Sequence, residues 1–273
     1  MSRLKTRFNA LRADNKAAFI SYIQAGDPSR DVSAKILTGL PAAGVDIIEL
    51  GMPFSDPSAD GPTIDRSAQR ALKAGASVQQ TLAMVTDFRM GDNETPIVLM
   101  GYFNPIHSYG IDQFTVDAAT AGVDGLIVVD LPPEEDEELR LPANKAGIDV
   151  IRLATPTSDT TRLPTILNGA SGFVYYVSVA GTTGGKSATA DNIAAAVGQI
   201  KKYTDLPVAV GFGIRTPQQA AEVAARADGA VVGSAIVEMI EAGIDKNGET
   251  KSGLAQEVLD FTRKLADGVK AGR

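Results

Sequence analysis

The sequence predicts an α/β fold, a (β/α)8 TIM barrel with an extra N-terminal helix. Eight short apolar runs alternate with segments that have the period of helices. The runs are hydrophobic throughout rather than at every second residue, as parallel strands covered by helices on both faces require. Similar phrases, AAGVD, TAGVD, KAGID and ARADG, precede four of the runs, where a Gly or another small residue ends a helix before the next strand.

The N-terminal segment is basic and places three apolar residues, Leu4, Phe8 and Leu11, on one helical face. We expect a helix packed on the barrel, and the alternative is an organelle-targeting peptide. The eight strands are expected at residues 17–23, 45–51, 96–102, 124–132, 149–155, 172–179, 207–213 and 229–236.

The helices are expected between these strands. Carboxylates in PPEEDEEL suit the N-terminus of the helix after the fourth strand, and Asp191 is the expected helix start after the sixth. The apolar face of the closing helix consists of Leu254, Val258, Phe261 and Leu265. Because no linker or low-complexity run divides the chain, residues 1–273 are expected to form a single domain.

Composition excludes several functional classes. The 273 residues carry a formal net charge of −7, which argues against a nucleic-acid partner held by a basic face. No apolar run approaches membrane-spanning length, so no membrane association is expected. The chain has no Cys, which removes thiolate nucleophiles and thiolate metal ligands. A cytoplasmic location is the default expectation.

Candidate catalytic carboxylates lie at one end of the second strand. In a (β/α)8 barrel the active face is formed by the carboxyl ends of the strands and the loops after them. Glu49 ends the second strand behind Ile47 and Ile48, so apolar surroundings could raise its pKa and suit it to acid–base chemistry. A structural salt bridge is an equal alternative for Glu49. Asp60 lies in the Pro/Gly-rich loop that follows, where ordinary turn chemistry is the alternative.

Glycines after the last two strands predict a phosphate site. Gly211 and Gly213 follow the seventh strand, and Gly233 and Ser234 follow the eighth. Backbone N–H groups at glycines can approach an anion closely, and these two loops often bind phosphate in this fold. The alternative for each glycine is a tight turn alone.

Two chemistries are excluded by missing residues. None of the eight runs contains the Lys that a Schiff-base aldolase requires. The one His, His107, is expected in a surface loop, so a metal site with His ligands is not expected. Cofactor-free acid–base chemistry on a phosphorylated small molecule remains.

The stretch AGTTGGKS at residues 180–187 is similar to a nucleotide-binding P-loop. The P-loop pattern requires Gly where Ala180 stands and a helix directly after the Lys-Ser pair, but the helix is expected only at Asp191. In a closed barrel this loop rises from the sixth strand over the mouth of the pocket. We therefore interpret it as a lid, with Lys186 as a surface charge.

Several motifs together resemble the α subunit family of tryptophan synthase. They are ELGMPFSDPSADGPTIDRSAQRAL at residues 49–72, GYFNPI at 101–106, VVDLPPEE at 128–135, VGFGI at 210–214 and VVGSAIV at 231–237. The resemblance covers essentially the full length. It implies retro-aldol cleavage of indole-3-glycerol phosphate to indole and glyceraldehyde 3-phosphate.

The resemblance also implies roles for individual residues. Glu49 matches the general acid and base, Asp60 the carboxylate that engages the indole N–H, and Tyr175 a tyrosine near the reacting centre. Thr183 matches a residue that contacts the catalytic carboxylates when the lid closes. The phosphate-binding positions are Gly184, Gly213, Gly233 and Ser234. Apolar positions that would clamp the indole, and that are also ordinary barrel residues, are Tyr22, Met100, Ile127, Leu153 and Phe212.

Three residues depart from the family pattern. Tyr22 replaces a frequent Phe, Asp65 stands where Gln is common, and Thr182 lies in a loop that usually reads GVTG. These changes concern substrate fit and loop motion rather than the reaction.

The family works as an α2β2 complex. Indole passes through an internal tunnel to a β subunit that carries pyridoxal phosphate, so this chain itself is expected to need no cofactor and no metal. The positions that match the partner interface are Pro53, Asp56, Asn104 and Pro132.

Two other functions stay open from the sequence. One is a different cofactor-free barrel enzyme, such as a sugar-phosphate isomerase, which would need no indole-sized pocket. The other is a non-catalytic activator of the β subunit, against which the presence of both Glu49 and Asp60 argues. An assay for indole release separates these functions from the lyase.

Overall fold

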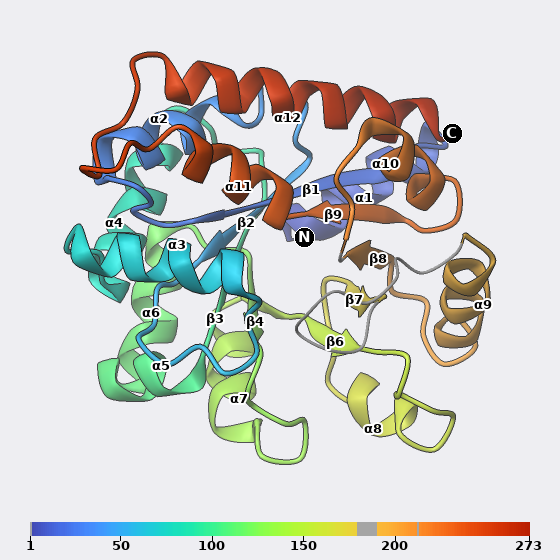
Figure 1. Ribbon diagram of the computed structural model, residues 1–273. Coiled ribbons are helices and arrows are strands. Elements are labelled where there is room, and N and C mark those ends of the chain that lie inside the picture. The colour runs from blue at the N-terminus through green and yellow to red at the C-terminus, as the bar shows by residue number, and fades with distance from the viewer. Residues whose placement is uncertain (1, 179–189, 212) are drawn as a thin grey trace.

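The computed structural model describes residues 2–178, 190–211 and 213–273. Its strands form one parallel sheet in the order β5-β4-β3-β2-β1-β9-β8-β7-β6, which curves into a barrel (Figure 1). The strands are β1 (Ala18–Gln24), β2 (Ile47–Gly51), β3 (Ile97–Gly101), β4 (Gly125–Val128), β5 (Asp149–Val150), β6 (Arg152–Ala154), β7 (Val174–Val177), β8 (Val208–Gly211) and β9 (Gly229–Val232). The (β/α)8 architecture predicted from the sequence is confirmed.

One strand position of the barrel is interrupted. The strand expected over residues 149–155 is split at Ile151 into β5, which pairs with β4, and β6, which pairs with β7. The Ile151 N–H still donates to the Leu126 carbonyl at 2.9 Å, so the barrel closes at this level. Beyond Ile151 the chain leaves β4 and stays with β7. The expected strand has the right position, but its continuity is wrong.

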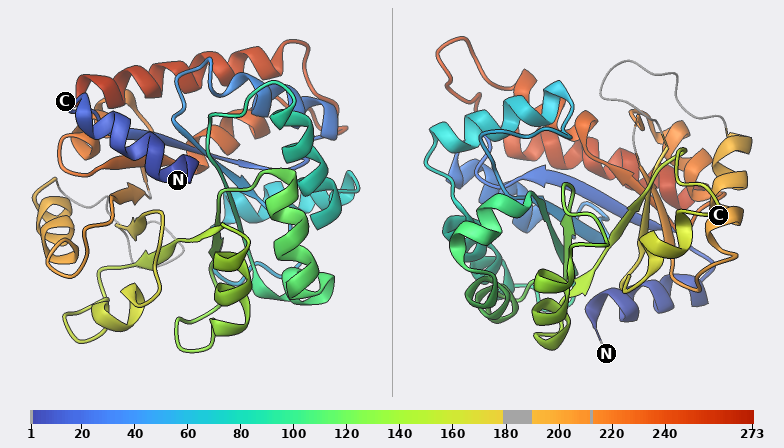
Figure 2. Two further views of the ribbon diagram at one scale, coloured as in Figure 1. Left: turned by 180° about the vertical axis from the view of Figure 1, so that it is seen from behind. Right: turned by 90° about the horizontal axis from the view of Figure 1, so that it is seen from below.

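Helices surround the sheet on its outer face, as the views in Figures 1 and 2 show. They are α2 (Arg30–Gly39), α3 (Pro62–Lys73), α4 (Val78–Arg89), α5 (Phe103–Tyr109), α6 (Ile111–Ala121), α7 (Glu137–Lys145), α8 (Leu163–Leu167), α9 (Ala190–Ile200), α10 (Pro217–Ala224), α11 (Ser234–Ala242) and α12 (Leu254–Ala271). Side-chain oxygens of Ser29, Ser77 and Thr216 cap three of them by accepting backbone N–H groups. None of the described helices is long and apolar enough to cross a membrane.

The N-terminal helix α1 (Arg3–Ala13) closes one end of the barrel. Its Leu4 and Phe8 are buried in the interior cluster of apolar residues, and the Phe8 ring centroid lies 5.7 Å from that of Phe173. The right-hand view of Figure 2 shows α1, in dark blue, lying across that end. The expected extra helix is therefore part of the core. The opposite end, where the strands have their carboxyl termini, is the end that can receive a ligand.

Two local expectations were wrong. The segment around His107, expected as a loop, is helix α5, in which Ile106 is fully buried and His107 packs on Phe103. Pro105 is compatible with this helix because it lies in the first turn, where no intrahelical N–H is needed. The strand expected over residues 229–236 ends at Val232, because the next segment, Ser234–Ala242, forms helix α11.

Candidate active site

Glu49 lies in β2 at the carboxyl end of the barrel, beside Tyr22 of β1 in the strand register. Its side chain is buried, and its Oε1 atom has no hydrogen-bond partner in the described part of the chain. Burial, together with the nearby charge of Asp60, raises the pKa of Glu49 to about 8. A carboxyl group with this pKa is protonated at neutral pH and can give or take a proton.

Asp60 lies in the loop between β2 and α3 and is held by Tyr102, which follows β3. The Tyr102 hydroxyl bonds to the Asp60 carboxylate and also accepts the Ala59 N–H at 3.0 Å. The ring of Phe54, at the start of the same loop, packs on Tyr102 with the centroids 5.3 Å apart. Burial raises the pKa of Asp60 to about 6, and the bond from Tyr102 opposes this rise. These contacts with Tyr102 hold the loop, and with it the Asp60 carboxylate, at the carboxyl end of β3.

Two tyrosines lie near Glu49. The pKa of Tyr175, on β7, is raised by its removal from water and by the charge of Glu49. The pKa of Tyr22 is raised by burial and by the charges of Asp60 and Glu49. Both phenols are therefore neutral over the physiological range, and the four side chains form one electrostatic group.

Glycines make the space for these phenols. A methyl group on Gly51 would overlap the Tyr22 hydroxyl, and one on Gly211 would overlap the Tyr175 hydroxyl. The Tyr22 hydroxyl donates to Gln24 Oε1 at 2.7 Å, and Gln24 Nε2 donates to the Gly51 carbonyl at 2.8 Å. The hydroxyl by which Tyr22 departs from the family pattern thus has a defined partner.

The predicted apolar lining is partly brought together. Met100 and Tyr22 line one small cavity with Asp60 and Tyr102. Ile127 is buried in the interior cluster, against which Leu153 also packs. Phe212 lies outside the described residues.

The predicted phosphate positions lie at the same end of the barrel. Gly211 of β8 pairs with Val231 of β9. Gly213 comes two residues after Gly211, and Gly233 comes two residues after Val231, so both glycines follow the carboxyl ends of neighbouring strands. Gly213 has φ +84°, which a side chain would disfavour. Gly233 precedes α11, and Ser234 is the first residue of that nine-residue helix. The free N–H groups of a helix N-terminus favour an anion at this place.

The predicted lid residues Thr183 and Gly184, like Thr182 and Lys186, lie outside the described residues.

The positions predicted to face a partner differ in exposure. Of these, Asp56, Asn104 and Pro132 are exposed, whereas Pro53 is buried. The side chain of Pro53 is therefore not part of the surface of this chain.

Sequence reasoning missed two residues of the site, Tyr102 and Gln24. Tyr102 directly follows β3 within GYFNPI, and Gln24 is the last residue of β1. Polar side chains at the carboxyl ends of barrel strands are the usual source of active-site residues, so this position was the available signal. Their roles depend on contacts with residues far along the chain, which no local pattern contains. Within the described ranges, no group of three or more His, Cys, Asp or Glu residues could hold a metal ion.

Two carboxyl groups with separated pKa values interact electrostatically at the carboxyl end of the barrel, around the small cavity that Asp60 and Tyr22 line; we call this region the chamber. At neutral pH, Glu49 is the protonated member and Asp60 the ionised one. Such a pair can divide acid and base roles without a cofactor.

Comparisons with known proteins agree with this chemistry. A profile described as tryptophan synthase alpha chain matches residues 8–270. The solved structure of tryptophan synthase subunit alpha from Legionella pneumophila is 38% identical, with 98% of each chain covered and a TM-score of 0.89. A tryptophan synthase structure from Mycobacterium tuberculosis is 39% identical, with 98% of each chain covered and a TM-score of 0.88. Another from that organism, in an aminoacrylate-bound form, is 37% identical, covers 98% of this chain and 100% of that chain, and has a TM-score of 0.86.

Proposed function

This chain belongs to the tryptophan synthase alpha chain family, and we propose that Glu49 and Asp60 carry out the reaction of that family in it. The chain is a lyase that cleaves indole-3-glycerol phosphate to indole and glyceraldehyde 3-phosphate. The observation that supports the residue assignment is the pair of raised pKa values, about 8 and about 6, in one chamber. Family membership disfavours the sugar-phosphate isomerase, and this pair of carboxyl groups disfavours the non-catalytic activator.

Proton transfer by Glu49 accounts for the bond cleavage. The protonated carboxyl gives its proton to C3 of the indole ring, which allows the ring to leave. The carboxylate that results takes the proton of the side-chain hydroxyl as the carbon–carbon bond breaks and the aldehyde forms. Glu49 is thereby returned to its starting state. Its Oε1, which has no protein partner in the described structure, is free for these transfers.

Asp60 and Tyr175 assist this step. Protonation at C3 places positive charge on the indole nitrogen, and ionised Asp60 stabilises that charge through the N–H group. Neutral Tyr175 lies near Glu49 and contacts the reacting centre. The apolar sides of the indole would be held by Tyr22, Met100, Ile127 and Phe212, with Thr183 acting from the lid.

The substrate phosphate would lie at the N-terminus of α11. Backbone N–H groups at Gly213 and Gly233 and the Ser234 hydroxyl supply donors there, and Gly184 of the lid adds another. Gly233 also packs on Tyr22, since a methyl group on it would lie 3.2 Å from Tyr22 Cβ. The phosphate would thus be anchored beside the indole chamber.

The pH dependence of kcat/KM tests the two carboxyl roles. We expect a bell-shaped profile whose acidic limb, near pH 6, follows ionisation of Asp60, and whose basic limb, near pH 8, follows deprotonation of Glu49. Tyr102→Phe removes a hydrogen bond that lowers the pKa of Asp60, so its acidic limb is expected to move to higher pH. Indole release measured between pH 5 and 9 gives both limbs.

Tyr109→Phe is the matched control for this experiment. Tyr109 also bonds to a carboxylate, with its hydroxyl 2.7 Å from Asp117 Oδ2, but it lies on α5 away from the chamber. Its profile should equal that of the unmodified chain. An acidic limb that is the same in Tyr102→Phe and in the unmodified chain would contradict the assignment to Asp60.

We also propose that the chain works with a tryptophan synthase β subunit in an α2β2 complex. Asp56, Asn104 and Pro132 are exposed beside the chamber, and the loop that contains Pro53 would contribute through its other residues. The indole would pass directly to the pyridoxal phosphate of the β subunit, and this chain would hold no cofactor of its own. We further propose that residues 1–273 form one domain, that the protein is cytoplasmic, and that it has no nucleic-acid or membrane partner.

Addition of the β subunit is expected to increase indole formation by at least tenfold. Contact with a partner can order the loops that complete a site, which raises the fraction of productive complexes. The measurement compares initial rates of indole release by this chain with and without the purified β subunit. Equal rates would contradict the proposed activation, although the lyase assignment would stand.

A further inference from the structure

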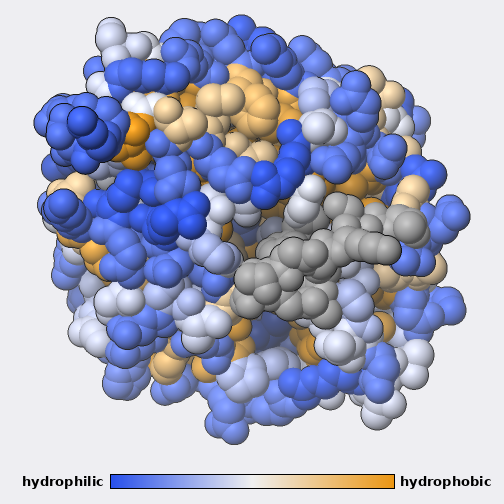
Figure 3. Space-filling model, in the orientation of Figure 1, coloured by the Kyte–Doolittle hydropathy of each residue, from blue (hydrophilic) through white to orange (hydrophobic). Residues whose placement is uncertain are grey.

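A large cavity lies outside the region around Glu49 and Asp60. It is a crevice of about 600 Å³ between β4 and β6, bounded on the outside by α7 and α8. The hollow below the centre of Figure 3 lies at this position. Ligand sites commonly have volumes of 300–1,000 Å³ and combine apolar walls with a few polar groups. The crevice has both features.

The crevice exists because the barrel wall is open on one side. β4 is paired with β5 through Gly125 and Leu126 only, whereas β6 is paired with β7. Towards the carboxyl ends of the strands, beyond Ile151, β4 and β6 share no ladder pairing. Val128 and Leu153 line the opening between them. The facing edges of two strands carry backbone groups that require hydrogen-bond partners, which a bound molecule can supply.

Arg152 provides a buried cation in this crevice. Its side chain is about 8% exposed, and one Nη atom is bonded to Asp136 and lies 3.5 Å from the Asn168 carbonyl oxygen. Its Nε–H has no hydrogen-bond partner among the described residues. Asp136 is shared with Arg140, whose Nε lies 3.0 Å from the same carboxylate. A buried guanidinium group that shares its one carboxylate partner in the described structure, and has an unused N–H there, is incompletely compensated.

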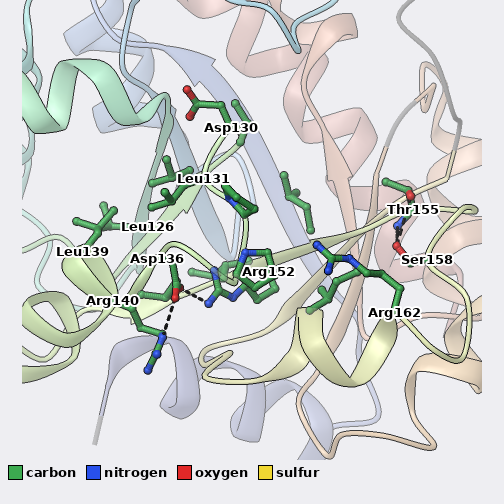
Figure 4. Close-up of a pocket in the computed structure, with 18 of the residues that line it drawn as sticks. Leu126, Asp130, Leu131, Asp136, Leu139, Arg140, Arg152, Thr155, Ser158 and Arg162 are labelled. Atoms are coloured by element: carbon green, nitrogen blue, oxygen red, sulfur yellow. Dashed lines mark hydrogen bonds and ion pairs between the residues drawn. The ribbon is translucent and has the colours of Figure 1, made fainter.

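A second cation and several hydroxyl groups stand beyond Arg152. Figure 4 shows Arg162 between Arg152 and the hydroxyl-bearing residues Thr155 and Ser158. Arg162 is paired with Glu134 at the exposed rim. The charged residues that line the crevice are Arg140, Arg152, Arg162, Asp130 and Asp136. Two of the three arginines, Arg140 and Arg152, share the carboxylate of Asp136.

The remaining wall is apolar. It is formed by Leu126, Leu139, Leu153 and Ile166. A ligand that matches both parts of the crevice therefore has an anionic head and an apolar body. Val129 lines both the crevice and the small cavity beside Asp60, so an occupant would touch a wall of the reaction chamber.

We propose that the crevice between β4 and β6 is a second binding site for a small organic anion with an apolar ring or chain. It is adjacent to the lyase site, with which it shares Val129 and the predicted indole-lining residue Leu153. The anionic group lies between Arg152 and Arg162, and the apolar body packs on the leucine and isoleucine side chains. The site takes carboxylates, sulfonates or phosphates, because all three accept hydrogen bonds from guanidinium groups.

Fluorescence titration of the full chain with 8-anilinonaphthalene-1-sulfonate tests this site. Arg162→Gln removes a cation from the rim and leaves Glu134 unpaired, so we expect the affinity to fall at least fivefold. Glu134→Gln frees Arg162, so we expect the affinity to rise at least twofold. Both side chains lie at the surface, 43% and 44% exposed, and neither change should prevent folding.

Arg66→Gln is the matched control. Arg66 forms a similar two-bond pair with Glu241, with distances of 2.6 and 2.8 Å, on a different part of the surface. Its affinity for the probe should stay within twofold of the unmodified chain. The neutral analogue N-phenyl-1-naphthylamine should not distinguish Arg162→Gln from the unmodified chain, because it has no anionic head.

A crystal structure of the chain soaked with the sulfonate probe locates the bound molecule. Electron density in the crevice with the sulfonate near Arg152 supports the proposal. The proposal is wrong if the density lies elsewhere, if the Arg162 and Glu134 variants change the affinity in the same direction, or if neither changes it.

Discussion

Replacement of Glu49 by Gln is expected to lower kcat for indole release by about 10³-fold, within the 10²–10⁴-fold range of general acid–base catalysis. Gln has nearly the same shape as Glu but can neither give the proton to C3 nor take the hydroxyl proton. The Glu49 side chain is buried beside Tyr22 and Tyr175, so the amide fits the same space without a new cavity. The measurement is single-turnover indole formation at pH 7.

Stability provides the control for Glu49→Gln. The pKa of Glu49 is about 8 in the folded chain and near 4.5 when unfolded, so the folded state binds more protons between these values. The stability that this group supports is present below about pH 4.5 and is lost as pH rises towards 8. Gln does not titrate, so the variant should melt at a temperature equal to or above that of the unmodified chain at pH 8. A normal rate in this variant would overturn the role of Glu49.

Asp60→Asn is expected to lower kcat/KM by about 10²-fold. A neutral amide cannot stabilise positive charge on the indole nitrogen as a carboxylate does, and loss of such a stabilising group costs roughly 10²–10³-fold. The charge of Asp60 also raises the pKa of Glu49, so its removal should move the basic limb of the pH profile to lower pH. The acidic limb should disappear. Measurement of kcat/KM from pH 5 to 9 checks all three effects.

Asp65→Asn is a suitable comparison for Asp60→Asn. Asp65 lies nearby on α3, and its charge raises the pKa of Asp60 without belonging to the chamber. Its removal should shift the acidic limb slightly to lower pH and leave kcat nearly unchanged. If Asp65→Asn lost as much activity as Asp60→Asn, net charge rather than contact with the indole would explain the loss.

Much of the fold could be predicted because its signals are local. Each strand overlaps one of the predicted apolar runs, and the second run, which ends in IIELG, ends at Gly51 as β2 does. The break at Ile151 could not be predicted, because it depends on which neighbouring strand the backbone follows. Helix α5 was missed because it is short and its one buried apolar residue, Ile106, gives no periodic pattern.

The candidate site divides in the same way. Glu49 and Asp60 could be found from their places at a strand end and in the loop beyond it. Their pKa values could not, because these depend on burial by distant segments and on the bond from Tyr102. The burial of Pro53 was also not predicted, since nothing in its loop indicates which residues turn inward.

The split at Ile151 also weakens the strand pairing that closes the barrel. Strands β1–β4 and strands β5–β9 are joined on one side by four register pairs between β1 and β9, but on the other by only two between β4 and β5. A closed ring opens first where its joint is weakest, and proteins open locally at different free-energy costs along the chain. We therefore expect the pairing between β4 and β5, beside Ile151, to open first. Its backbone amides should exchange their protons with solvent faster than those that pair β1 with β9.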